Sequence, residues 1–223
     1  MSESYEGVVL PEMDSRDLRS ILIPKVIAAK DRFDVNFVPD YKPPEVGPWL
    51  DTENKLPGPL EPYFLRANTG PRWMLGGAMS RPFINASQCS EKFAISSIEG
   101  SSAYKESSPP LARWLTFPSV DHCFLVQEGL LKVILKGDDT WTSVREGQTL
   151  VISAGQAFAI AFGSRYVRAV SFTNGRGIEE LIQTAGTSFS GFVLPEEPVP
   201  WEESRLQKAA EAIGVQLGEN VAV

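Results

Sequence analysis

The sequence contains one histidine, His122, and this count limits the chemistry of the chain more than any other. A neutral imidazole transfers protons near neutral pH, so His122 is the first candidate for an acid–base catalyst. The alternative is a core histidine that is hydrogen-bonded to the backbone. Adjacent strand residues face opposite sides, so a catalytic dyad of His122 with Cys123 is geometrically poor. Two cysteines, Cys89 and Cys123, are too few for a disulfide scaffold or a structural zinc site.

Three cations lie in strand-like runs and could polarise a carbonyl or support the loss of water: Arg72, Lys132 and Arg168. The alternative places each of them on a solvated strand face, with Arg72 stacked on Trp73. Glu179 and Glu180 are expected on a solvated helix face. The sequence has no phosphate-binding loop, dinucleotide fingerprint or G-x-S-x-G elbow, so no nucleotide cofactor is predicted.

The composition excludes several classes of partner. The chain has 223 residues, with 21 Lys and Arg against 28 Asp and Glu, which gives a net charge of −7. Such an acidic chain is not expected to bind nucleic acid or anionic membranes. The N-terminus lacks the cationic start and apolar core of a secretion signal, and no apolar run is long enough to span a bilayer. We therefore expect a cytoplasmic protein with reduced cysteines.

Proline and glycine indicate where the regular structure lies. Residues 39–62 are proline-rich and predict an extended arm, preceded by a helix over 15–30 that is interrupted near Pro24, so that residues 1–61 form an N-terminal region. Short strands with glycine turns recur every eight to twelve residues over 62–175 and predict an all-β barrel or sandwich. Helical periodicity that ends at Gly186 and again at Gly214 predicts two short helices within a C-terminal extension over 176–223.

Two stretches carry a family resemblance, DHCFLVQEGLLKVIL and REGQTLVISAGQAFAIAF. They resemble the paired motifs of the cupin superfamily, in which a strand, a hairpin and a second strand precede a glycine-containing turn and the last strands. The segments PYFLRANTGPRWMLGG, GIEELIQTAG and AIGVQLGEN are similar to the opening and closing segments of quercetinase-like cupins. The resemblance covers roughly residues 62–218 and implies a jelly-roll β-barrel.

The resemblance also locates the metal-binding positions of that family. Its first motif holds two histidines as H-x-H followed by a glutamate, and a later strand supplies a third histidine. Aligned on this sequence, the four positions fall on Leu115, Phe117, His122 and Phe158. Three of these side chains are apolar, whereas iron, copper and nickel need several converging nitrogen or oxygen ligands. We therefore expect no metal and no other cofactor.

A barrel without its metal is expected to keep an apolar, aromatic interior. By the alignment, the inward side chains that line this interior are Leu115, Phe117, Phe124 and Phe158, with Trp73 and Trp114 nearby. His122 replaces the metal-binding carboxylate, so it should also point inward. One of Arg72, Lys132 and Arg168 is expected to reach the mouth. The alternative for the apolar set is ordinary barrel core.

The resemblance extends to metal-free cupin-like proteins of fungal natural-product pathways. It implies a cofactor-independent enzyme that dehydrates or cyclises an aromatic polyketide or meroterpenoid intermediate, including hetero-Diels–Alder ring closure in tropolone sesquiterpenoid pathways. Two alternatives stay open: a metal-dependent quercetinase-like dioxygenase, and a non-catalytic cupin that binds a small molecule. A small apolar or aromatic substrate is the expected ligand. Because proline-rich arms often connect subunits and cupins commonly pair, we also expect a homodimer.

Overall fold

The computed structural model describes residues 69–107, 110–191 and 193–223, together with residues 56, 58, 63 and 65. The chain divides into two compact units, 1–49 and 50–223, and the described residues belong to the second. The helix predicted over 15–30 lies outside the described residues, as does most of the proline-rich arm predicted over 39–62. Within the part that is described, no helix is both long and apolar enough to cross a membrane.

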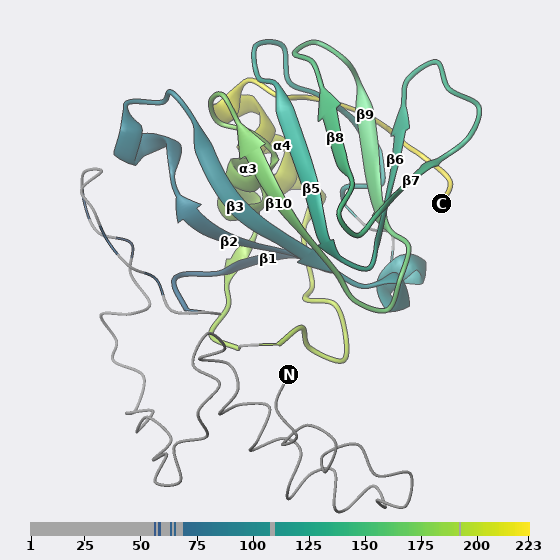
Figure 1. Cartoon of the computed structure of the whole chain (residues 1–223), viewed down its shortest axis with the longest axis horizontal. Coiled ribbons are helices and arrows are strands. Elements are labelled where there is room, and N and C mark those ends of the chain that lie inside the picture. Colours follow the sequence, from purple (N-terminus) through teal and green to yellow (C-terminus); the bar gives the residue numbers. More distant parts are fainter. Residues whose placement is uncertain are drawn as a thin grey trace, which may run out of the picture. The chain divides into compact units, whose positions relative to one another are not determined.

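The larger sheet is antiparallel and has seven strands (Figure 1). Its strands in spatial order are β11 (Thr187–Ser188), β1 (Trp73–Leu75), β2 (Ala78–Ile84), β3 (Ala94–Gly100), β10 (Val167–Thr173), β5 (His122–Glu128) and β8 (Thr149–Ile152). Two 3₁₀ turns flank β3, namely η4 (Ala86–Cys89) and η5 (Ser102–Ser107). The strands β1, β2 and β3 follow one another in the sequence, whereas β10 pairs with β3 and β5 across long sequence separations, so the centre of the sheet depends on long-range pairing.

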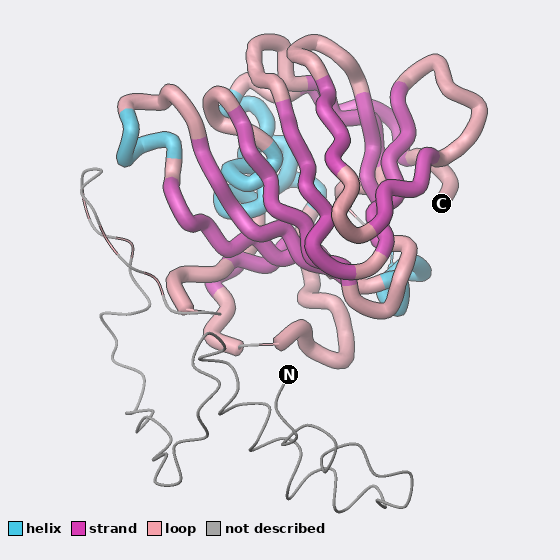
Figure 2. The backbone as a smooth tube through the Cα atoms, viewed as in Figure 1, coloured by secondary structure: helices cyan, strands magenta, loops and turns pink. Residues whose placement is uncertain are grey.

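A second antiparallel sheet has five strands: β12 (Gln216–Asn220), β4 (Arg113–Thr116), β9 (Phe158–Phe162), β6 (Leu130–Leu135) and β7 (Thr142–Arg145). Apolar side chains from both sheets form one core between them. Figure 2 shows that strands dominate the described chain and that helix is confined to short segments. Two facing antiparallel sheets make a double-sheet jelly roll. The predicted all-β, cupin-type jelly roll is therefore confirmed.

Side chains alternate across β5 as the sequence pattern predicts. His122, Phe124 and Val126 are buried between the sheets, whereas Leu125 is 40% exposed on the outer face. The outer face continues on β8 and β10 with Val151 and Phe172, which are also exposed. The strands β10, β5 and β8 thus carry an apolar row on their outer side, and we call Leu125, Val151 and Phe172 the outer row.

The two predicted C-terminal helices are confirmed as α3 (Ile178–Ala185) and α4 (Glu203–Ile213). Helix α3 contacts β1, β2 and β3, and α4 contacts α3 (Figure 1). Gly214 takes the left-handed conformation (φ +75°) that ends α4. The chain then continues into β12, a strand that the sequence analysis did not identify, and β12 pairs with β4. Val221 donates a backbone hydrogen bond to Ala112, so residues after β12 also contact the five-stranded sheet.

The connection from β5 to β6 passes from the larger sheet to the smaller one at a glycine that no other residue can replace without strain. Gly129 has a φ of +79°, and a Cβ atom built on it would lie 2.2 Å from the carbonyl oxygen of Tyr166. Glycine is the residue that adopts this conformation at least cost and that allows such a close backbone approach. Gly129 therefore fixes the distance between this connection and the segment that leads into β10.

Candidate functional site

The four positions aligned with the metal ligands of quercetinase-like cupins converge between the sheets. Leu115 on β4 is the register partner of Phe158 on β9. The ring centroid of His122 lies 4.4 Å from that of Phe117 and 5.2 Å from that of Phe158. Phe124 joins this group with a centroid 5.9 Å from that of His122. All five side chains belong to residues at most 2% exposed, so they pack against one another.

These positions do not fit a transition metal. Three of the four side chains are apolar, and the Nε2 atom of His122 accepts a hydrogen bond from the backbone N–H of Ile178 at 3.1 Å. A metal ion needs several nitrogen, oxygen or sulfur ligands at about 2 Å. Among the described residues there is also no group of three His, Cys, Asp or Glu side chains that could hold an ion. The side chains of the protein itself therefore have to carry out any chemistry of this chain.

His122 is held as a neutral imidazole. Burial lowers its pKa to about 4, and the Val120 backbone and the charge of Asp121 oppose this effect only in part. Because Nε2 accepts the Ile178 N–H, the proton of the neutral ring is assigned to Nδ1. The observed geometry matches the alternative considered for this residue, a core histidine bonded to backbone. Its proposed role as a proton shuttle stays a prediction.

The expectation that Glu179 is solvated is wrong, because this residue is 1% exposed. Its Oε1 atom accepts hydrogen bonds from the backbone N–H of Gly177 at 2.7 Å and from Thr173 Oγ1 at 3.0 Å. Its Oε2 atom is buried without a hydrogen-bond partner. Burial raises the pKa of Glu179 to about 7, although these hydrogen bonds lower it. The helical periodicity of the sequence did not predict this burial, because the burial arises in the fold, where the first turn of α3 lies next to the end of β10.

His122 and Glu179 both lie close to one glycine. A Cβ atom built on Gly177 would lie 2.9 Å from Glu179 Oε2 and 2.9 Å from His122 Nε2. Thr173 belongs to the same group, since it is the register partner of His122. An imidazole and a carboxyl group are therefore both buried near Gly177, where α3 follows β10.

Three of the predicted site residues lie apart from His122. Lys132 is half-buried on β6 between Leu131 and Val133, which point into the core, so Lys132 faces outward. Trp114 on β4 is half-buried and contacts Gly218 of β12. Trp73 is half-buried on β1 and pairs with Ser80. The structure does not bring these residues to the aromatic interior around His122.

Arg72 and Arg168 gather instead around Glu99, on the outer face of the larger sheet. Arg168 on β10 is the register partner of Glu99 on β3, and the Nε atoms of Arg168 and Arg81 each lie 4.0 Å from Glu99 Oε1. Arg72 is 3% exposed and donates a hydrogen bond to the carbonyl of Gly191. Burial lowers the pKa of Arg72, and the negative charge of Glu99 counteracts this effect. Arg168 therefore lies beside a glutamate that the sequence analysis did not identify, and the charge of this glutamate also acts on Arg72.

Two uncharged hydroxyl groups also donate hydrogen bonds to the carboxylate of Glu99. Ser97 Oγ donates to Glu99 Oε1 at 2.9 Å, and the hydroxyl of Tyr166 donates to Oε2 at 2.8 Å. Burial and the charge of Glu99 raise the pKa of Tyr166 well above its ordinary value, so the phenol stays protonated. We call Arg81, Glu99, Tyr166 and Arg168 the Glu99 cluster. Its one sequence signal is the charge that appears at outward positions of β2, β3 and β10.

An open cleft of about 900 Å³ lies beside the Glu99 cluster. Glu99, Tyr166 and Arg168 line it, and the further lining residues are Ser101, Ala103, Tyr104, Glu128, Arg165, Val193, Leu194, Pro195 and Glu196. The hydroxyl of Tyr104 donates to the carbonyl of Pro195, which fixes the wall formed by residues 193–196. This volume lies within the range that small-molecule sites occupy.

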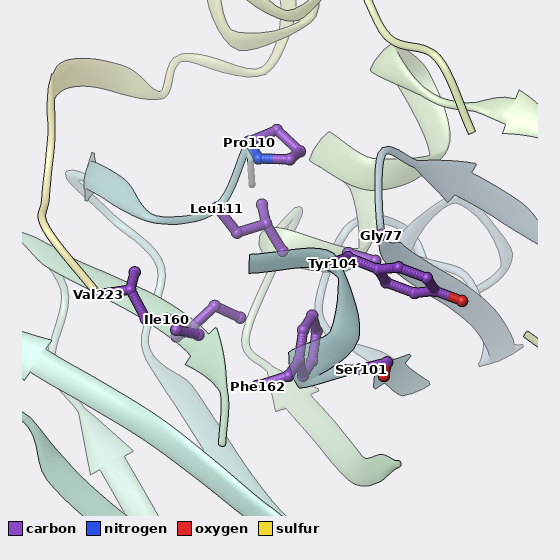
Figure 3. A pocket seen from close by; sticks show the side chains of 10 residues that line it. Gly77, Ser101, Tyr104, Pro110, Leu111, Ile160, Phe162 and Val223 are labelled. Atoms are coloured by element: carbon purple, nitrogen blue, oxygen red, sulfur yellow. The ribbon is translucent and has the colours of Figure 1, made fainter. Parts of the chain in front are cut away.

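A second pocket is much smaller, at about 20 Å³ (Figure 3). Leu111, Ile160, Phe162 and Tyr104 surround it, and it has room for roughly one water molecule. Of these two spaces, the cleft beside Glu99 is the one that could take an organic substrate. The candidate functional site is therefore the Glu99 cluster together with its cleft.

No family model matches the sequence, and no curated protein matches it. Among solved structures, ectoine synthase from P. lautus is similar with a TM-score of 0.38 and 10% identity, over 57% of this chain and 80% of that chain. The Cnp3 cupin domain of Schizosaccharomyces pombe has a TM-score of 0.35 and 11% identity, over 44% and 64%. An HTH_3 family transcriptional regulator from Vibrio cholerae has a TM-score of 0.34 and 14% identity, over 44% and 51%.

These likenesses are distant, and the chain spans only about half of the Vibrio cholerae regulator and under two thirds of the Cnp3 domain. The strand order and register of the two sheets define the fold, and the described part of this chain is an all-β jelly roll of two antiparallel sheets.

Proposed function

We propose that this chain is a metal-independent enzyme that binds an aromatic substrate in the cleft beside Glu99 and dehydrates or cyclises it. The observation that carries the proposal is a carboxylate, fixed by Ser97 and Tyr166, on the wall of a cleft of about 900 Å³. A carboxylate positioned in a substrate-sized cleft is a candidate general base. The resemblance described above supplies the substrate class, an aromatic polyketide or meroterpenoid intermediate.

Glu99 acts as the base in a dehydration that needs no external reagent. It takes the proton from a phenolic O–H of the substrate, and the electron pair of that bond moves through the ring and expels a benzylic hydroxyl group. The hydroxyl group leaves as water with the proton that Glu99 returns. Tyr166 and Ser97 hold the carboxylate in place during both transfers. The product is a quinone methide, and no metal or redox cofactor enters the balance.

Ring closure follows within the same cleft. A quinone methide is reactive enough to add to an alkene without further activation, so the enzyme needs to hold the two partners in one orientation. Holding the two reacting groups in the correct orientation removes a large share of the free-energy barrier to such a reaction. The wall of residues 193–196, fixed by Tyr104, limits the conformations that a bound intermediate can take.

The test uses metal-stripped protein and hydroxybenzyl alcohols with an alkene side chain, with loss of water followed by mass spectrometry. Glu99→Gln should reduce turnover by at least about 100-fold, the usual contribution of a general base. Glu146→Gln, at an exposed turn outside the cleft, is the matched control. Turnover that disappears with a chelator and returns with iron, copper or nickel would contradict the proposal.

A small-molecule-binding protein without catalytic activity is the second candidate. The packing of His122 against Phe117 and Phe158 favours it over a metal-dependent dioxygenase, because no ligand set remains at the aligned positions. Saturable binding of the same compounds with no conversion, in wild type and Glu99→Gln alike, would establish this candidate instead.

A further inference from the structure

Two guanidinium groups share a single carboxylate oxygen in the Glu99 cluster. The Nε atoms of Arg81 and Arg168 both lie 4.0 Å from Glu99 Oε1, which is too long for a hydrogen bond. Ser97 and Tyr166 occupy the carboxylate oxygens at 2.9 and 2.8 Å. The two arginines are therefore near the charge of Glu99, but their Nε atoms do not donate a hydrogen bond to it.

Both arginines retain buried donors that have no partner. Arg81 is 3% exposed, and its Nη2 atom makes no hydrogen bond, while its Nη1 atom donates to the carbonyl of Thr69 at 3.3 Å. The Nε atom of Arg168 is also buried and unbonded. Unpaired donors of a buried cation are costly. Arg81 and Arg168 thus carry two positive charges beside the single charge of Glu99, in a chain whose net charge is −7.

We propose that Arg168, reinforced by the positive charge of Arg81 behind it, binds a carboxylate group of the ligand that occupies the cleft. Arg168 lines the cleft, and the buried Arg81 lies on the other side of the same Glu99 oxygen. A planar guanidinium matches a carboxylate in a two-point hydrogen bond. This assignment rests on the proposed function only in taking the bound ligand to be the substrate.

The charged residues that line the cleft favour a ligand with a single negative charge. Glu128 and Glu196 line the same space as Arg165 and Arg168, so the lining carries acidic groups besides Glu99. Phosphate, with its higher charge, would meet these carboxylates as well as the arginines, and like charges repel it. A monocarboxylate attached to an aromatic ring places one charge at the arginines and presents uncharged surface elsewhere. The ligand class is therefore an aromatic monocarboxylic acid.

The experiment compares 4-fluorobenzoate with 4-fluorobenzamide by fluorine NMR on the full chain. The two probes have nearly the same shape, and only the first is charged. We expect the acid to bind about tenfold more tightly, because it forms charge-assisted hydrogen bonds. Arg168→Gln should abolish this preference. Arg145→Gln, which removes an exposed arginine of β7 outside the cleft, should keep it.

Equal affinity for the two probes in the wild type would overturn the assignment, and so would an unchanged preference in Arg168→Gln. Displacement of fluorobenzoate by inorganic phosphate at lower concentrations than by acetate would overturn the choice of a carboxylate. Glu99→Gln separates this inference from the proposed function, since it removes the competing negative charge and should tighten fluorobenzoate binding while turnover is lost. If the wild type turns over the substrate but binds the acid and the amide equally well, this inference alone is contradicted. Acid preference without turnover would contradict only the proposed function.

Discussion

Burial acts in opposite directions on the two titratable groups beneath α3. It lowers the pKa of His122 to about 4 and raises that of Glu179 to about 7, so both groups are driven towards their neutral forms. The histidine contributes stability that is present above its ordinary pKa of 6.5 and is lost as the pH falls through about 4. For Glu179 the pH dependence runs in the opposite direction. The stability that Glu179 contributes to the fold is present below its ordinary pKa of 4.5 and is lost as the pH rises through about 7.

Glu179→Gln should therefore change how stability depends on pH. The amide keeps an acceptor for Gly177 and Thr173 but cannot ionise, so the loss between pH 4.5 and pH 7 disappears. Relative to wild type, the variant should gain free energy of unfolding across this window, by at most about 1.4 kcal/mol per pH unit. Urea denaturation at several pH values measures it, with Glu146→Gln as the exposed control. Parallel curves for wild type and Glu179→Gln would show that the carboxyl group is already ionised when buried.

Single residues of the site were predictable where local pattern decides their orientation. Strand alternation and the alignment placed Leu115, Phe117, His122 and Phe158 together, and the ring distances show that they do meet. Glu99 was not predictable, because its partners come from strands that are distant in sequence and pair with β3 only in the fold.

At the scale of elements, turn residues and hydrophobic periodicity were sufficient to predict most strands and helices of the described barrel. The QEG turn and the alternation around it predicted the strands β5 and β6, and the i, i+3, i+4 spacing predicted α3 and α4. The hairpin expected between β5 and β6 is wrong, because the two strands belong to different sheets. Strand β12 was missed because its burial pattern is almost wholly exposed, so no apolar alternation marks it. Backbone pairing with β4 defines this strand instead.

Gly129→Ala tests how much the close approach in the β5–β6 connection contributes. The variant meets both an unfavourable positive φ and the Tyr166 carbonyl, so it should lose about 2 to 4 kcal/mol of stability. Gly147→Ala is the matched control, since Gly147 has a φ of +77° but open space around its Cβ position. It should lose only about 1 kcal/mol. Chemical denaturation compares the two, and equal losses would mean that the connection shifts freely away from Tyr166.

At the scale of the molecule, the fold class could be predicted because glycine, proline and strand formers are distributed at jelly-roll spacing. The location of the candidate site could not. The chain carries its ligand-sized cleft on the outer side of the larger sheet, where residues 193–196 return to β3 and β10. The position of such a returning segment depends on tertiary contacts, including the hydrogen bond from Tyr104 to Pro195.

The homodimer expected from the sequence can be tested on the outer row. Val151 is 65% exposed on β8, which is an edge strand, and Leu125 and Phe172 continue the apolar surface. Val151→Glu would place a charge in this row and should shift the full chain from dimer to monomer in sedimentation velocity. Val193→Glu, at a valine that is 77% exposed and lies outside the row, should leave the dimer intact. An unchanged sedimentation coefficient for both variants would place the dimer contact elsewhere.

Strand β12 pairs with β4, and the residues after it reach Ala112. The wall of the barrel that contains β4 and β9 therefore stays incomplete until residues 216–220 have emerged from the ribosome. Strands made much earlier must wait with an unpaired edge, a condition that favours aggregation during synthesis. Expression at lower temperature or with chaperones should consequently raise the yield of this protein more than changes to its surface would.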